Sequence, residues 1–77
     1  MKKIISIIGS TGSIGLTTLS IIDKKNNFFK INLLSSNKNY NLICKQIQIY
    51  RPNFFVISDK DIFLKVKNKF KNKKTKI

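Results

Sequence analysis

The chain has 77 residues, and its 16 Lys and Arg against three Asp and Glu give a formal net charge of +13. This length excludes more than one small domain, and a chain of this size buries only about 60% of its unfolded surface, so we expect a marginal core. The charge favours phosphate-bearing partners such as nucleotides, nucleic acids or membrane surfaces, although heavy use of Lys, Asn and Ile also indicates an A+T-rich gene.

The opening segment MKKIISIIG places two lysines before an apolar run, as a signal peptide does. Ser6 and Gly9 interrupt this run, whereas a signal core needs roughly 7 to 15 apolar residues and a membrane span roughly 20. The single cysteine, Cys44, cannot form an intrachain disulfide and is typical of a small apolar helix residue in a reducing compartment. We therefore expect a soluble cytoplasmic protein.

The first half of the chain predicts strand, helix and strand. Residues 3–8 are apolar almost without alternation, which is typical of a parallel strand covered on both faces. Apolar residues then recur at helical spacing over residues 13–24, and polar residues 23–27 end that helix. Residues 28–34 read as a second strand, followed by a polar turn.

The second half repeats the alternation. Apolar residues keep a helical period over residues 40–50 until Pro52 forbids continuation. Residues 53–58 then predict a third strand. Ser58 followed by Asp61 resembles a capping box, which opens a third helix with an apolar stripe.

The resulting order β-α-β-α-β-α, with short connections, predicts an α/β fold with a three-stranded parallel sheet and right-handed crossovers. This arrangement is half of a doubly wound fold. We expect residues 1–70 to form it and the basic residues 71–77, where apolar periodicity ends, to be a disordered tail. Open sheet edges would make such a half-fold prone to aggregation.

The heptapeptide GSTGSIG, residues 9–15, stands between the first strand and the first helix. Free N–H groups and the dipole at a helix N-terminus favour a phosphate, and side chains there would block its approach. We expect Gly9 to allow the tight turn, Gly12 the close approach of the phosphate, and Gly15 the packing of the helix on the sheet. Three hydroxyl groups are available to the same anion: Ser10, Thr11 and Ser13.

The spacing G-x-x-G-x-x-G departs by one residue from the dinucleotide fingerprint G-x-G-x-x-G, and it lacks the Gly-Lys-Ser/Thr of a P-loop. Three glycines alone are weak evidence for nucleotide binding, because a plain structural turn would also use them. Their place at the first strand-to-helix turn favours nucleotide phosphate binding.

The end of the second strand reads Ser35-Ser36-Asn37-Lys38-Asn39, where an acid would bind the ribose hydroxyls of NAD. No acid is present, and a lysine between neutral polar residues suits a 2′-phosphate, which favours NADP over NAD. The alternative is that Lys38 is a solvated turn residue and Asn39 caps the next helix.

At these residues the sequence resembles the N-terminus of the 1-deoxy-D-xylulose 5-phosphate reductoisomerase family. GSTGSIG, the Lys38-Asn39 pair, Phe29-Lys30 at the second strand and Arg51-Pro52 before the third fall at family-like spacing. The resemblance covers Lys2 to about Leu64. It implies that residues 1–70 are the N-terminal part of an NADPH-binding, Rossmann-like domain.

The resemblance implies an NADPH-dependent oxidoreductase of isoprenoid precursor synthesis, which rearranges and reduces 1-deoxy-D-xylulose 5-phosphate to 2-C-methyl-D-erythritol 4-phosphate. It further implies the dinucleotide contacts Thr11, Gly12, Ser13, Ile14, Asn37, Lys38 and Asn39. Asn37 replaces the glycine usual in such proteins, and Asn tolerates the left-handed backbone that a glycine would adopt there.

Family members are several-fold longer, form homodimers and use a divalent metal, Mg or Mn, whose ligands lie beyond the region of resemblance. Asp23, Asp59 and Asp61 stand at helix ends, where capping or dipole roles are expected instead of metal binding. The chain has no histidine. We therefore expect no catalytic residues here, and no activity of this chain alone.

Two other functions remain open at this stage. A small basic protein that binds nucleic acid would account for the lysines, but the aromatic residues fall on predicted strands and helix stripes, which favours core packing over base stacking. The chain could also be a truncated product without a function of its own. The sequence offers no specific support for a nucleic-acid or membrane partner.

Overall fold

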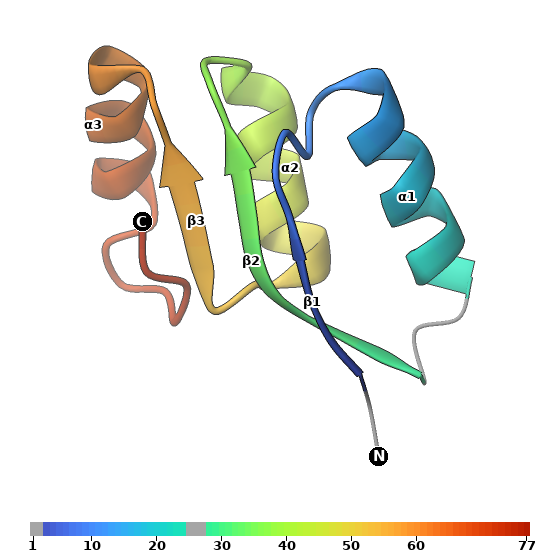
Figure 1. Cartoon of the computed structure of the whole chain (residues 1–77). Coiled ribbons are helices and arrows are strands. Elements are labelled where there is room, and N and C mark those ends of the chain that lie inside the picture. Colours follow the sequence, from blue (N-terminus) through green and yellow to red (C-terminus); the bar gives the residue numbers. More distant parts are fainter. Residues whose placement is uncertain (1–2, 25–27) are drawn as a thin grey trace.

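The computed structural model describes residues 3–24 and 28–77, so Met1, Lys2 and most of the polar exit predicted for the first helix lie outside the described residues. In chain order the elements are β1 (Lys3–Ile7), α1 (Ser13–Lys24), β2 (Phe29–Ser36), α2 (Tyr40–Tyr50), β3 (Phe54–Ile57) and α3 (Lys60–Lys69). The strands form one parallel sheet in the order β1-β2-β3 (Figure 1). The predicted α/β fold class is confirmed.

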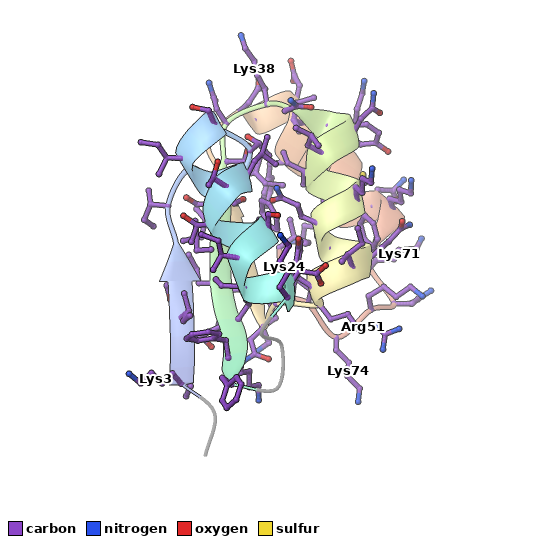
Figure 2. All side chains as sticks on the ribbon, turned by 90° about the vertical axis from the view of Figure 1, so that its right-hand side faces the viewer. Lys3, Lys24, Lys38, Arg51, Lys71 and Lys74 are labelled. Atoms are coloured by element: carbon purple, nitrogen blue, oxygen red, sulfur yellow. The ribbon has the colours of Figure 1, made fainter. Side chains whose placement is uncertain are left out.

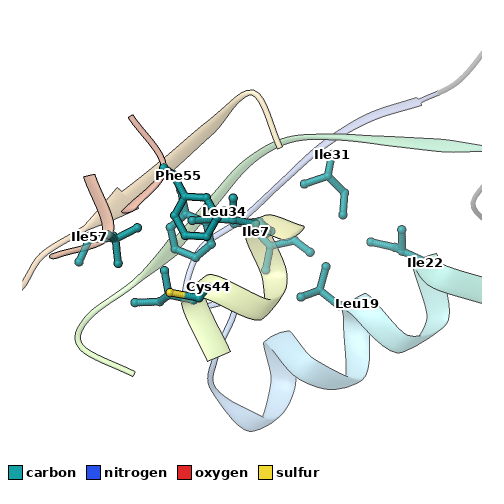
Figure 3. Close-up of a cluster of buried hydrophobic side chains, with 12 residues drawn as sticks. Ile7, Leu19, Ile22, Ile31, Leu34, Cys44, Phe55 and Ile57 are labelled. Atoms are coloured by element: carbon teal, nitrogen blue, oxygen red, sulfur yellow. The ribbon is translucent and has the colours of Figure 1, made fainter. Parts of the chain in front are cut away.

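The helices lie on one face of the sheet, and the core fills the space between the two layers (Figures 1 and 2). Apolar side chains at helical spacing face the alternate side chains of the strands, so both layers remove apolar surface from water. Figure 3 shows this cluster. Its members are Ile7, Leu19, Ile22, Ile31, Leu34, Ile43, Cys44, Ile47, Phe55, Ile57, Val66 and Phe70.

The opposite face of the sheet is uncovered, which differs from the prediction for the first strand. In β3, Phe55 is 1% exposed, whereas its neighbours Phe54 and Val56 are 42% and 52% exposed. In β1, Ile4 is 71% exposed. The prediction failed because an apolar run shows only that a strand can be covered twice, and the helices here cover one face. The sequence predicted that the aromatic residues pack in the core. Phe28 and Phe54 do not, since they are 66% and 42% exposed.

Side chains and backbone together fix the helix ends. The Leu42 amide donates to Asn39 Oδ1 at 3.4 Å, so Asn39 caps α2 as one reading of the sequence predicted. The α3 cap is Asp59, whose carboxylate accepts from the Asp61 and Ile62 amides, so the predicted capping box at Ser58 is wrong. The Ser58 hydroxyl instead donates to a neighbouring loop.

Residues 75–77, at the end of the segment that was expected to be disordered, contact the domain. The Phe55 amide donates to the Lys76 carbonyl at 2.8 Å, which extends the sheet by one isolated bridge beside β3. Buried Thr75 donates its hydroxyl to the Pro52 carbonyl at 2.6 Å. Backbone pairing holds this segment in place, and such pairing leaves no apolar periodicity in the sequence.

No helix within residues 3–24 and 28–77 has the length and apolar character needed to cross a membrane.

The burial of two leucines predicts a large difference in how much their replacement by alanine lowers the free energy of unfolding. Leu34, in the central strand β2, is fully buried, while Leu64 on α3 is 53% exposed. We expect Leu34→Ala to lower the free energy of unfolding by about 2–5 kcal/mol, because it leaves a cavity, and Leu64→Ala to change it far less. Urea unfolding of both variants checks this, and equal losses would contradict the assignment of the core.

Candidate functional site

Three loops meet at one edge of the sheet, where the parallel strands end (Figure 1, upper edge). They are residues 8–12 after β1, residues 37–39 after β2 and residues 58–59 after β3. The Ser58 amide donates to the Ser36 carbonyl at 3.1 Å, and the Ser58 hydroxyl donates to Asn37 Oδ1 at 2.8 Å. In open α/β sheets, ligands bind outside this carboxyl edge.

The loop after β1 turns sharply into α1. Gly9 has φ +75°, a conformation that L side chains rarely adopt, which confirms its predicted role in the tight turn. The Gly12 amide donates to the Gly9 carbonyl at 3.1 Å, and the Leu16 amide donates to the Gly12 carbonyl at 2.8 Å. The chain therefore passes from turn to helix without an intervening extended residue.

Ser10 anchors this loop to α2 through a reciprocal pair of hydrogen bonds. Its hydroxyl donates to Gln46 Oε1 at 2.6 Å, and Gln46 Nε2 donates to the Ser10 carbonyl at 2.8 Å. Both residues are buried, at 0% and 3% exposure. Ser10 is thus unavailable to an anion, and the expectation that its hydroxyl faces one is wrong.

The end of β2 holds the same loop from the other side. The Ser10 amide donates to the Ser35 carbonyl at 2.7 Å, and the Gly9 amide donates to Ser35 Oγ at 3.0 Å. Thr11 Oγ1 and Ser36 Oγ share a hydrogen bond of 2.6 Å. These contacts fix the loop before any ligand arrives, which lowers the cost of ordering it on binding.

Two of the glycines differ in what a side chain would meet. A Cβ at Gly15 would lie 2.3 Å from the Gly9 oxygen and 2.7 Å from Ser10 Cα, so α1 can approach the loop only because this residue is glycine. The contact is with the loop backbone and not, as predicted, with the sheet. A Cβ at Gly12 would meet only the Gly9 oxygen, at 3.4 Å. The chain's own packing therefore does not require glycine at position 12.

The N-terminus of α1 opens onto solvent beside Gly12. Ser13 and Ile14 are exposed, the latter at 83%, and Thr11 is half-buried. The first N–H groups of an α-helix have no acceptor within the helix, and together with the helix dipole they favour an anion. No acidic residue lies in the first turn of α1, so no carboxylate competes for these donors. The four residues at positions 11–14, which the resemblance implied as dinucleotide contacts, thus lie together at this helix N-terminus.

The loop after β2 presents Lys38 to solvent, at the top of the molecule in Figure 2. Its neighbours are engaged in the fold, since Asn37 accepts from Ser58 and Asn39 caps α2. Of the three residues predicted here, Lys38 offers the charged group for a ligand. The other two hold the loop.

Asn37 does not adopt a left-handed backbone. Among the described residues, only Gly9 and Arg51 have positive φ. The left-handed backbone that a glycine would adopt at this position is therefore not present, and the Asn37 side chain accepts from the Ser58 hydroxyl in the loop after β3.

Sequence reasoning missed the residues that hold the site together. Gln46 lies among buried Ile43, Cys44 and Ile47, and a polar residue at helical spacing within an apolar stripe is a signal that could have identified it. Ser35 and Ser36 carried no such signal. Their role depends on which loop lies beside them.

The described residues contain no group of three or more His, Cys, Asp or Glu side chains that could hold a metal ion. Asp59 caps α3, and Asp61 lies in the first turn of that helix, which confirms the predicted capping role for Asp59. The residues of this region therefore do not form a metal centre by themselves.

Comparison with known families identifies a match over most of the chain. The sequence model of the family described as 1-deoxy-D-xylulose 5-phosphate reductoisomerase matches residues 5–77, which includes the lysine-rich end. Among curated relatives, a protein of that name from Clostridium novyi is 47% identical over 66 residues, or 86% of this chain and 17% of the relative. One from Pelagibacter ubique is 43% identical over 77 residues, all of this chain and 20% of the relative.

Solved structures show the same fold. The reductoisomerase from Zymomonas mobilis in complex with NADPH superimposes with a TM-score of 0.90 at 21% identity, over 99% of this chain and 20% of that one. A reductoisomerase in complex with magnesium gives 0.83 at 24% identity, over 94% of this chain and 18% of that one. The chain thus spans about a fifth of the length of the proteins that it matches.

The two glycines predict opposite sensitivities of the fold. We expect Gly15→Ala to destabilise the protein by about 1–3 kcal/mol, because its Cβ would collide with backbone atoms that cannot rotate away. Gly12→Ala should destabilise the protein clearly less, because its Cβ would meet only the Gly9 oxygen at 3.4 Å. Thermal unfolding of the two variants measures the difference, and a stable Gly15→Ala protein would refute the close approach of α1 to the loop.

Proposed function

The chain belongs to the 1-deoxy-D-xylulose 5-phosphate reductoisomerase family, and we propose that it forms the NADPH-binding part of such an enzyme. In this proposal the loop after β1 and the N-terminus of α1 hold the pyrophosphate, while Lys38 faces the 2′-phosphate of the adenosine. The complete enzyme converts 1-deoxy-D-xylulose 5-phosphate to 2-C-methyl-D-erythritol 4-phosphate.

The observation that carries the proposal is Gly12. This residue is exposed, and a Cβ there would meet only one chain atom, at an ordinary contact distance. Its φ is not positive, so the backbone does not need glycine either. A ligand that must come close to the backbone explains the glycine, because a phosphate bound by amide N–H groups approaches to about 3 Å.

Three further residues fit a dinucleotide at this place. Thr11 and Ser13 bring hydroxyls to the helix N-terminus, and Ile14 presents an apolar surface at 83% exposure. The Thr11 hydroxyl is already held by Ser36, so its orientation is fixed in advance. The solved relative from Zymomonas mobilis, which has the same fold, is a complex with NADPH.

Selectivity for NADPH over NADH would come from Lys38. An ammonium group attracts the 2′-phosphate, which NADH lacks, whereas an acid at this position would favour the free ribose hydroxyl. The chain provides no acid between Asp23 and Asp59. No carboxylate therefore lies near Lys38 in sequence, and Asp59, whose amide donates to the Asn37 carbonyl at 3.2 Å, is engaged in capping α3.

The role of this chain would be to bind and orient the cofactor, which supplies the hydride for the reduction. It contains no histidine, and its described residues form no metal centre. Catalysis, magnesium or manganese binding and substrate recognition would then require the rest of a reductoisomerase. A cytoplasmic location belongs to the same proposal and is supported by the free, buried Cys44.

Substitution of Gly12 tests the site directly. We expect Gly12→Val to abolish NADPH binding, because two methyl groups would occupy the path of the phosphate. Fluorescence titration with NADPH measures the affinity, and thermal unfolding of the same variant shows that the fold remains. Unchanged affinity would show that this loop does not bind the phosphate.

Substitution of Lys38 tests the cofactor preference separately. We expect Lys38→Ala to weaken NADPH binding about tenfold and to leave NADH binding nearly unchanged, because a charge-assisted hydrogen bond contributes about 1.5–3 kcal/mol. Lys74→Ala is the matched control, since Lys74 lies at the opposite end of the molecule (Figure 2). Equal weakening by both substitutions would indicate a general effect of charge.

A further inference from the structure

Gln46 on α2 is a buried polar residue whose two polar atoms both bond to the loop after β1. Its side chain is 3% exposed. Gln46 Oε1 accepts from the Ser10 hydroxyl at 2.6 Å, and Gln46 Nε2 donates to the Ser10 carbonyl at 2.8 Å. A buried amide is costly unless its hydrogen bonds are made, so this pair has one favourable arrangement. Gln46 therefore holds the backbone of Ser10 as well as its hydroxyl.

The position of Ser10 in turn decides where α1 begins. A Cβ at Gly15 would lie 2.3 Å from the Gly9 oxygen and 2.7 Å from Ser10 Cα, so the first turn of α1 lies directly against this backbone. The Gly12 amide, one residue before α1, donates to the Gly9 carbonyl at 3.1 Å. Because the unpaired amides of a helix lie at its N-terminus, a shift of this loop would move the donors that are proposed to hold the pyrophosphate.

The loop that carries Lys38 is held by other contacts. Asn39 caps α2 at its N-terminus, and Asn37 accepts from the Ser58 hydroxyl at 2.8 Å. Neither contact involves Gln46, which lies almost two turns further along α2. Loss of the Gln46 amide should therefore disturb the loop after β1 and leave the loop after β2 in place.

We propose that Gln46 is a positioning residue for the cofactor, which holds the loop after β1 so that the N-terminus of α1 faces the pyrophosphate, without touching the dinucleotide itself. This inference rests on the proposed function. NADP and NAD both carry the pyrophosphate, whereas only NADP carries the 2′-phosphate. Loss of the Gln46 amide should thus weaken both cofactors by the same factor, in contrast to loss of Lys38. A role in stability alone would leave the affinity of the folded chain unchanged.

Replacement of Gln46 by leucine removes both hydrogen bonds to Ser10. Calorimetric titration with NADP⁺ and NAD⁺ measures the two affinities, and circular dichroism gives the folded fraction to which they refer. We expect Gln46→Leu to weaken both cofactors about tenfold and to leave the ratio of their affinities unchanged, because the loop must then be ordered on binding. Gln48→Leu is the matched control, since Gln48 lies on the same helix and is exposed, and it should bind both cofactors as the wild-type chain does.

Replacement of Gln46 by glutamate keeps the shape of the side chain and makes the effect depend on pH. A protonated carboxyl can make both bonds to Ser10, whereas a carboxylate cannot donate to the Ser10 carbonyl. Burial raises the pKa of a carboxyl above its ordinary value of about 4.3. The NADP⁺ affinity of Gln46→Glu, relative to wild type, should therefore be reduced near about pH 8 and recover towards about pH 5. Gln48→Glu should show no such recovery, and the ratio to wild type removes the titration of the cofactor's own phosphates.

The outcomes separate the inference from the proposed function. Unchanged affinity of the folded Gln46→Leu and Gln46→Glu chains would overturn the inference, as would a loss in Gln46→Glu that acid does not restore. A changed ratio of NADP⁺ to NAD⁺ affinity would overturn it too, because the effect would then reach the loop of Lys38. Binding that Gly12→Val abolishes and Gln46→Leu leaves intact is a failure of the inference alone. A wild-type chain that binds neither cofactor is a failure of the proposed function and of the inference with it.

Discussion

The reciprocal hydrogen bonds between Ser10 and Gln46 tie the turn after β1 to a helix 36 residues further along the chain. Both partners are buried, so each would be costly to leave unpaired, and the pair fixes the position of α2 relative to the loop. Ser35 holds the same loop from β2. The exposed residues at the start of α1 are therefore presented by a loop that is held on two sides.

The close approach of α1 follows from the same arrangement. With Ser10 held inward, the backbone of Gly9 and Ser10 forms the surface on which the first turn of α1 packs, and only glycine at position 15 permits that contact. The helix N-terminus is thereby brought to the carboxyl edge of the sheet. Gly15 thus shapes the fold, whereas Gly12, with free space around it, remains available to a ligand.

One-sided packing explains the rest of the molecule. All helices of the described chain cover one face, so β3 buries Phe55 and Ile57 and exposes Phe54 and Val56. The exposed residues are still apolar, which fits a family whose members are about five times longer than the region matched here. The sequence is thus suited to a sheet with two covered faces, of which this chain builds one layer.

The sequence by itself determined the alternation of strands and helices, the end of α2 before Pro52 and the role of Gly9, because these depend on local periodicity and backbone preference. It also brought Thr11 to Ile14 and Lys38 to one edge, since parallel strands end together. Only the tertiary structure decided that Ser10 turns inward to Gln46, that Asp59 and not Ser58 caps α3, and that Lys76 pairs with β3. These depend on contacts between segments far apart in the chain, which neither spacing nor composition records.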